Sequence, residues 1–284
     1  MKVHTITTDA PDDRRQAYLK KVRALLTQAE NVATTPEEAK AFSEKAQELM
    51  ERYAFSQIEL EALGIRERDE IVNVTFLVEA PYAKAKQDLW FRICLANNVK
   101  MVVSGDCKRV KTIKVPDETR PSGFRHEYVR DAKGKLVKGG YVYLTGFRTD
   151  VEHVEMLFTS LYVQATNEVF SIEVPSWENT KSFRNAFLYG YSHAIGSRLA
   201  KVRREVQEQE VIRFQQEQGT DLLPVLRSRS EQVKEAYEKR YGGRKSGKVQ
   251  FTYRAGTGYS AGGQAASRAD IGSARLGSRK ALSS

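Results

Sequence analysis

The chain has 284 residues, of which 40% are hydrophobic and 10% aromatic, and this composition is ordinary for a globular protein of one or two domains. It contains no run of about 18 apolar residues and no N-terminal signal pattern, so we expect neither a membrane-spanning helix nor secretion, and we place the protein in the cytoplasm. Its two cysteines, Cys94 and Cys107, are too few for a disulfide framework and lack the spacing of a zinc site.

The net charge of +10 is unevenly distributed along the chain. Counting Lys and Arg against Asp and Glu gives about −4 for residues 1–80, about +8 for 81–140, about −5 for 141–180 and about +11 for 181–284. A solvated surface explains moderate imbalance, whereas positive charge concentrated in two regions favours a polyanionic partner.

Residues 13–66 are expected to form a helical hairpin domain. The segment DRRQAYLKKVRALLTQAE at 13–30 places its apolar residues on one helical face and its Arg and Lys residues on the other. A second helix is indicated at 34–53, where Thr35 is suited to the N-cap and Glu38 to the matching capping-box position. The link NVATT is short enough to make the two helices antiparallel.

The hairpin sequence also carries a resemblance. Its marks are the pattern K-x-R-x-L-L-x-x-A-E, the start P-E-E-A and the ending K-A-Q-E-L-M, all within residues 20–56. On these motifs the segment resembles the N-terminal domain of an uncharacterised bacterial and phage family, the domain of unknown function 2786. The resemblance implies a bacterial or phage origin, with the host cytoplasm as the location of a phage-encoded protein, and it implies no established chemistry.

Residues 67–175 are expected to form an α+β domain in which helices pack on a small antiparallel sheet. Alternating apolar residues predict strands, and the apolar spacing of AKAKQDLWFRICLANNV predicts a helix. The predicted elements are a strand at 70–80, a helix at 83–99, strands at about 100–104 and 108–115, and a hairpin from 124 to 147.

Thr149 and Glu152 form a second capping-box pattern, which predicts that a helix begins there and runs to about residue 169. The run GYVYLTGFRTDVEHVEMLFTSLYVQA resembles the companion domain that often follows the N-terminal domain in the same family, over about residues 85–170. A lysine-rich insertion at 106–138 interrupts that resemblance in this chain.

Residues 176–241 are expected to be helical. The apolar stripe predicts a long helix at 180–218 and a shorter one at 225–241. Gly190 and Gly196 lower the helix propensity of the long helix, so we expect them to lie where another element packs closely.

The last segment, 242–284, is basic and rich in Gly, Ala and Ser, and we expect it to be a disordered tail. Residues 1–12 are expected to be an N-terminal tail that precedes the hairpin domain. GGRKSGK at 242–248 has P-loop spacing, but a predicted helix precedes it and Val249 replaces the hydroxyl residue that would hold magnesium. GTGYSAG is one residue too long for a dinucleotide fingerprint. The glycines at 242–243 are better explained as a helix stop.

Nothing in the sequence marks a catalytic or metal-binding group. No two histidines have the spacing of a helical metal site, and His153 is expected on a solvated helix face. Asp150, Glu152 and Glu155 are interpreted as an acidic first helical turn favoured by the helix dipole. We therefore predict no catalytic residue, no metal ligand and no cofactor. The four histidines are His4, His126, His153 and His193.

Basic residues interleaved with aromatic residues are the strongest functional pattern. Cations neutralise phosphates and release counterions, and exposed rings on a strand can stack with unpaired bases. Against this, alternating tyrosines also pack in cores, and hairpin lysines also protect an edge strand from aggregation. The candidate nucleic-acid-binding residues are Lys108, Arg109, Lys111, Lys114, Arg125, Tyr128, Arg130, Lys133, Lys135, Lys138, Tyr141 and Tyr143, with Arg244, Lys245 and Lys248 in the tail.

Three functions remain open from the sequence. The leading hypothesis is a non-enzymatic protein that binds single-stranded DNA or RNA through backbone charge and aromatic stacking. The alternative is a scaffold that binds a protein partner or itself through the helical hairpin and the long helix. The third is a hydrolase or nuclease whose His and carboxylate groups converge only in the folded chain.

Overall fold

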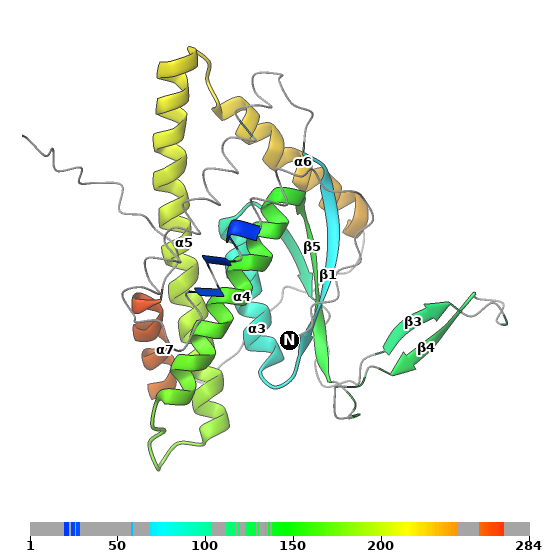
Figure 1. The fold of residues 1–284 in the computed structure, drawn as a ribbon, viewed down its shortest axis with the longest axis vertical. Helices are drawn as coiled ribbons and strands as arrows, with labels where there is room; N and C mark the ends of the chain where they lie inside the picture. The colour runs from blue at the N-terminus through cyan, green and yellow to red at the C-terminus, as the bar shows by residue number, and fades with distance from the viewer. Residues whose placement is uncertain are drawn as a thin grey trace, which may run out of the picture.

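The computed structural model describes residues 69–103, 138–242 and 256–269 without a break, together with shorter stretches (Figure 1). The shorter stretches are 20–22, 24, 25, 27, 28, 58, 112–116, 119, 123–128, 130, 134 and 136. Most of the predicted N-terminal hairpin therefore lies outside the described residues. The fold is α+β, as predicted, and none of the described helices is both long and apolar enough to cross a membrane.

Three antiparallel strands form the main sheet in the order β1–β5–β2. Their bounds are Ile71–Glu79 for β1, Lys100–Val103 for β2 and Gly139–Phe147 for β5. Successive side chains of a strand point to opposite faces of a sheet. In the central strand β5, Val142 and Leu144 accordingly lie on a buried inner face, and Tyr141 and Tyr143 lie half-buried on the other face.

Helices α3 (Ala83–Ala96) and α4 (Arg148–Ser171) cover the inner face. Three rings join the layers: Phe76 of β1 stacks on Trp90 of α3 at 4.9 Å between centroids, and Trp90 stacks on Phe158 of α4 at 4.1 Å. Burial raises the pKa of the Cys94 thiol in this core, which fits its predicted packing role. The predicted apolar stripes are buried, at Leu89, Trp90, Ile93, Cys94, Val99, Val151, Val154, Leu157, Phe158, Leu161 and Ala165.

The N-terminus of α4 is capped from a distance. The predicted capping box of Thr149 and Glu152 is wrong, because the helix begins directly after β5 at Arg148 and Phe147 occupies the N-cap. The Thr149 backbone N–H instead donates to Asp69 Oδ2 at 3.0 Å, from the segment before β1. The Asp69 carboxylate, which precedes β1, thus accepts the hydrogen bond from a backbone N–H group in the first turn of α4. The sequence had predicted that a side chain within the helix itself would do so.

Helix α5 (Thr180–Gln218) forms the next layer, against α3 and α4. The Asn179 side chain accepts from the backbone N–H groups of Lys181 and Ser182, both at 3.1 Å, and Gly219 ends the helix in the left-handed conformation at φ 65°. The predicted bounds of this long helix are confirmed.

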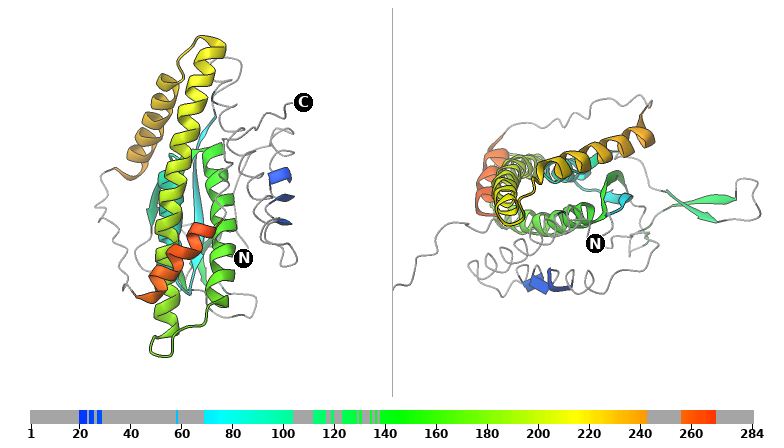
Figure 2. Two further views of the ribbon diagram at one scale, coloured as in Figure 1. Left: turned by 90° about the vertical axis from the view of Figure 1, so that its left-hand side faces the viewer. Right: turned by 90° about the horizontal axis from the view of Figure 1, so that it is seen from above.

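Helix α7 (Thr257–Arg268) lies against α5 on the side away from the sheet (Figure 2). The prediction of a disordered tail is wrong for these residues. Their small side chains, interpreted as low-complexity sequence, instead let two helix backbones approach closely. Residues 243–255 and 270–284, with the GGRKSGK motif beyond its first glycine, lie outside the described residues.

Helix α6 (Leu223–Tyr241) packs on the opposite side of the strands from α4 (Figure 2). Its buried Arg229 lies 3.6 Å from the Phe147 ring centroid and 3.9 Å from carboxylate oxygens of Asp69 and Asp150. These contacts fasten α6 to the end of β5 where α4 begins.

Strands β3 (Thr112–Pro116) and β4 (Phe124–Tyr128) form a separate two-stranded ribbon that projects from the body of the protein (Figure 1). The predicted hairpin from 124 to 147 is wrong in its pairing. β4 pairs with β3, and β5 is instead the centre of the main sheet, between β1 and β2. Period-two alternation identifies strands but not their partners, which explains the error.

Candidate nucleic-acid interface

The side of the main sheet opposite α3 and α4, called here the outer face, is partly open. It carries the half-buried Tyr141 and Tyr143 of β5, with Leu77 of β1 and Val102 of β2 opposite them in the strand register. Helix α6 lies near one end of these strands and the β3–β4 ribbon lies near the other (Figure 1). The open part of the outer face is therefore bounded by two elements that carry basic residues.

Three of the predicted tyrosines follow one another from the sheet to the ribbon. The Tyr143 and Tyr141 rings lie 6.2 Å apart between centroids with their planes tilted by 40°. Tyr141 Oη donates to the Thr112 carbonyl at 3.2 Å, and Thr112 pairs with Tyr128 across the ribbon. Tyr128 is 63% exposed. We call Tyr143, Tyr141 and Tyr128 the tyrosine row.

The environment of Tyr141 keeps its hydroxyl protonated. Partial burial raises the pKa of the Tyr141 phenol, and the neighbouring Tyr143 adds a smaller shift in the same direction. A protonated hydroxyl can donate the hydrogen bond to Thr112. This bond ties the base of the ribbon to the outer face.

Three of the predicted cations, Arg125, Arg130 and Lys138, have side chains that the structure describes; all three are exposed, but they are not equally available. Arg125 forms an ion pair with Glu127 at 2.5 Å, which offsets its charge. Arg130 donates to the Gly134 carbonyl at 2.8 Å and keeps its full charge in that bond, and Lys138 is exposed at the start of β5. Lys114 lies opposite His126 in the ribbon register.

The other predicted residues lie outside the described part of the chain. They are Lys108, Arg109, Lys111, Lys133, Lys135, Arg244, Lys245 and Lys248.

Two cations near the outer face were missed. Lys100 of β2 pairs with Thr145 in the register, which places it on the same face as Tyr143, and Lys234 lies on α6. Alternation within β2 could have identified Lys100 as outward-facing. No sequence signal could have placed Lys234 beside it, because that depends on where α6 packs.

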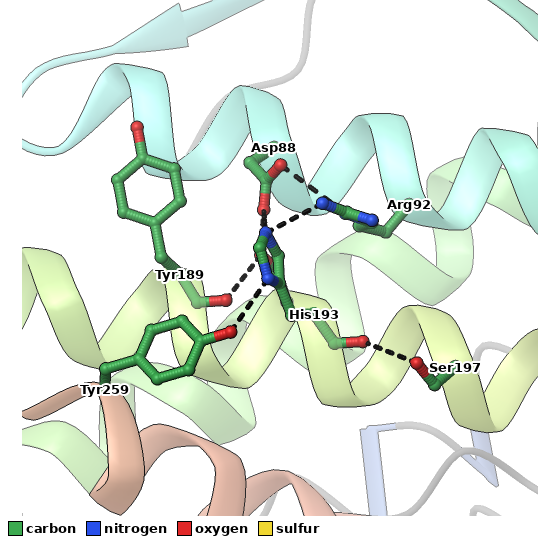
Figure 3. A network of polar contacts seen from close by, with 7 residues as sticks. Asp88, Arg92, Tyr189, His193, Ser197 and Tyr259 are labelled. Atoms are coloured by element: carbon green, nitrogen blue, oxygen red, sulfur yellow. Dashed lines mark hydrogen bonds and ion pairs between the residues drawn. The ribbon is translucent and has the colours of Figure 1, made fainter. Parts of the chain in front are cut away.

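A polar network with a buried centre and a partly exposed rim links three helices and was also missed (Figure 3). Asp88 of α3 is fully buried, and the buried Ser192 of α5 donates to its Oδ2 atom. Arg92 of α3 lies with its Nε atom 3.5 Å from Asp88 Oδ1 and donates from Nη2 to His193 Nε2 at 2.7 Å. His193 Nδ1 lies 2.9 Å from Tyr259 Oη of α7.

The contacts of His193 define its protonation. A guanidinium can only donate, so Nε2 accepts from Arg92 and the ring proton of the neutral imidazole sits on Nδ1, which donates to Tyr259. Burial, and then the Arg92 charge, lowers the pKa of His193, although Asp88 at 3.6 Å opposes this shift. The imidazole is therefore neutral near pH 7.

The network has the residue types of a catalytic triad but not its geometry. A triad needs a serine hydroxyl hydrogen-bonded to the imidazole and open to substrate. Here Ser192 donates to Asp88 and is fully buried. The arrangement instead holds α3, α5 and α7 together.

The other histidine and acidic predictions are partly corrected. His153 is buried rather than solvated, and Asp150 is buried beside Arg229, although it does lie in the first turn of α4 as predicted. Within the described ranges, no group of three or more His, Cys, Asp or Glu residues could hold a metal ion.

Residues 17–57 match the family described as a protein of unknown function, DUF2786. The resemblance found in the sequence at 20–56 is thereby confirmed, whereas the resemblance of about 85–170 to a companion domain stays a prediction. No curated protein and no solved structure matches the chain.

Proposed function

We propose that the protein binds single-stranded DNA or RNA, without catalysing a reaction, through its outer face and ribbon. The observation that carries this proposal is the tyrosine row. Two neighbouring rings lie on the outer face of β5, and a contact from Tyr141 to the ribbon leads to the exposed ring of Tyr128. Successive unpaired bases can stack on such rings, and every base offers a flat face for this contact.

Charge around the row supports the same function. Arg130 and Lys138 lie exposed on the ribbon side, and Lys100 lies on the side of α6. Cations in these places can neutralise phosphates along a strand that crosses the outer face, with a gain from released counterions. A duplex would keep its base faces stacked internally, so this surface favours a single strand over a duplex.

Replacing Tyr143 tests the role of the rings. Stacking contributes about 1–3 kcal/mol per base, so Y143L should weaken binding of a fluorescent single-stranded 15-mer by about tenfold or more. Y143F keeps the ring and should bind as the wild type does. Fluorescence anisotropy at low salt measures both affinities, with DNA and RNA probes in parallel.

If Y143L binds as tightly as Y143F, stacking on the outer face is not how the strand is held. If the wild type binds no more tightly than about millimolar at low salt, which is weaker than ordinary non-specific binding, the proposed function fails altogether.

A further inference from the structure

A second recognition feature lies beside the outer face, where α3 ends. The chain leaves α3 at Asn97, turns through Asn98 in the left-handed conformation at φ 55°, and enters β2 at Lys100. Helix α6 packs near this turn, and between them opens a pocket of about 360 Å³. That volume lies within the range of small-ligand sites, about 300–1,000 Å³.

The pocket walls suit a planar ring. Phe91 of α3 and Tyr237 of α6 both line it, so aromatic surface is offered from two elements. Leu95 beside them is 67% exposed and adds apolar surface. Asn98 also lines the pocket, and an asparagine amide can both donate and accept hydrogen bonds, as the edge of a nucleobase requires.

The charges at the pocket suit a phosphate. Lys100 and Lys234 both line it, and Glu238, 4.0 Å from Lys234, is its one acidic lining residue. The pocket thus carries a net positive charge next to apolar and aromatic surface. A purely apolar ligand would leave this charge unused, whereas a nucleotide uses the rings, the amide and the lysines together.

The position of the pocket connects it to the tyrosine row. Val102 pairs with Tyr143 across β2 and β5, and Lys100 is two residues along the same strand. Strand geometry therefore places the Lys100 and Tyr143 backbones roughly 8 Å apart. A strand that stacks one base on Tyr143 reaches the pocket with a neighbouring nucleotide.

We propose that this pocket binds the base and phosphate of one nucleotide, adjacent to the nucleotides that stack on the tyrosine row. The assignment rests on the proposed function. It adds a specific site for one nucleotide at the end of the surface that the tyrosine row forms. It also makes affinity depend on strand length in a stepwise manner, because the gain comes only when the strand is long enough to enter the pocket.

The test is a length series of oligothymidylates and oligouridylates of about two to six nucleotides, titrated against the full chain by calorimetry. For the wild type, the nucleotide that enters the pocket should raise the affinity about tenfold. Y237L should lose this step but keep the affinity for shorter strands, and K234Q, at an exposed position, should reduce the same step. K239Q, at an exposed position of α6 outside the pocket lining, is the matched control for K234Q and should retain the step, while Y143L should weaken every length.

The outcomes separate the pocket from the proposed function. If Y237L and K234Q keep the wild-type length profile, the pocket assignment is overturned while strand binding stands. If no length binds, the proposed function fails and the pocket assignment with it. Titration with uridine monophosphate and with octanoate is the second measurement, and tighter binding of octanoate would assign the pocket to an apolar anion instead.

Discussion

At the residue scale, His193 combines an unusual environment with a clear consequence. Arg92 donates to one ring nitrogen and Tyr259 accepts from the other, so the neutral ring satisfies both neighbours. A second proton would place an N–H against the guanidinium, and burial together with Arg92 accordingly lowers the pKa of His193 in the folded protein. Folding therefore opposes protonation of this residue.

The direction of the pH effect follows from that lowered pKa. Between the folded pKa and the unfolded value of about 6.5, the unfolded chain binds more protons at this site than the folded chain. The contribution of His193 to stability is thus present above about pH 6.5 and is lost as the pH falls towards the folded pKa. H193Q, which cannot titrate, should show a smaller fall in the free energy of unfolding between about pH 7.5 and 5.5.

Urea denaturation of both proteins at each pH measures this difference. The comparison removes the shared contribution of carboxylates elsewhere in the chain. An identical pH profile for H193Q and the wild type would contradict the assigned protonation state.

At the element scale, the packing of α7 on α5 depends on glycines that lack a Cβ atom. A Cβ at Gly262 would collide with the Phe187 carbonyl and lie 2.8 Å from the Tyr191 backbone nitrogen, whereas a Cβ at Gly263 would meet nothing within 4 Å. Gly190 of α5 makes the same close approach to the Tyr259 carbonyl from the other side. The close packing expected at Gly190 and Gly196 is confirmed, with α7 as the partner of the first and Arg92 of α3 against the second.

The neighbouring glycines of α7 provide a matched pair of variants. G262A should destabilise the fold by about 1–3 kcal/mol, because the backbone carbonyl of α5 cannot move aside cheaply. G263A should instead stabilise it by about 0.5–1 kcal/mol, through helix propensity alone. Thermal and urea unfolding measure both changes, and equal effects of the two substitutions would show that α7 does not pack on α5 as described.

Most elements could be predicted from the sequence because their signals are local. The stripe from Phe183 to Leu199 and the stop at Gly219 define α5, and the alternation around Val142 and Leu144 defines β5. The partner of β4 and the cap of α4 could not be predicted. Each depends on a group distant in sequence, and Asp69 reaches Thr149 only after the sheet has formed.

The residues of the candidate sites also fall into those with a local sequence signal and those that come together only in the fold. Tyr141 and Tyr143 were predicted because every second residue of a strand lies on the same face, which is a local signal. The network around Asp88 was missed because Ser192, His193 and Tyr259 come from helices that converge only in the fold. Helix α7 was missed because a sequence rich in small residues predicts disorder unless a neighbouring backbone is close enough to pack on it.

At the scale of the whole molecule, the two sides of the main sheet differ in how they are packed. A continuous hydrophobic core joins the inner face to α3, α4, α5 and α7, and the Asp88 network adds polar contacts between α3, α5 and α7. Among the described residues, α6 packs over one end of the outer face, and the tyrosine row stays partly exposed, with Tyr141 and Tyr143 half-buried and Tyr128 exposed. A surface of this kind can bind a flexible strand without rearranging the core.

The salt dependence of single-strand binding by the full chain tests most directly whether the outer face and ribbon bind nucleic acid. We predict that log Kobs falls linearly with log salt concentration, and that R130Q/K138Q makes the slope shallower by about 1.4, since each phosphate contact on a single strand contributes about 0.7. K181Q/K201Q removes two exposed lysines from α5, away from the outer face, and should keep the wild-type slope. An affinity that does not change with salt, or equal slopes for the two double variants, would contradict binding through the outer face and ribbon.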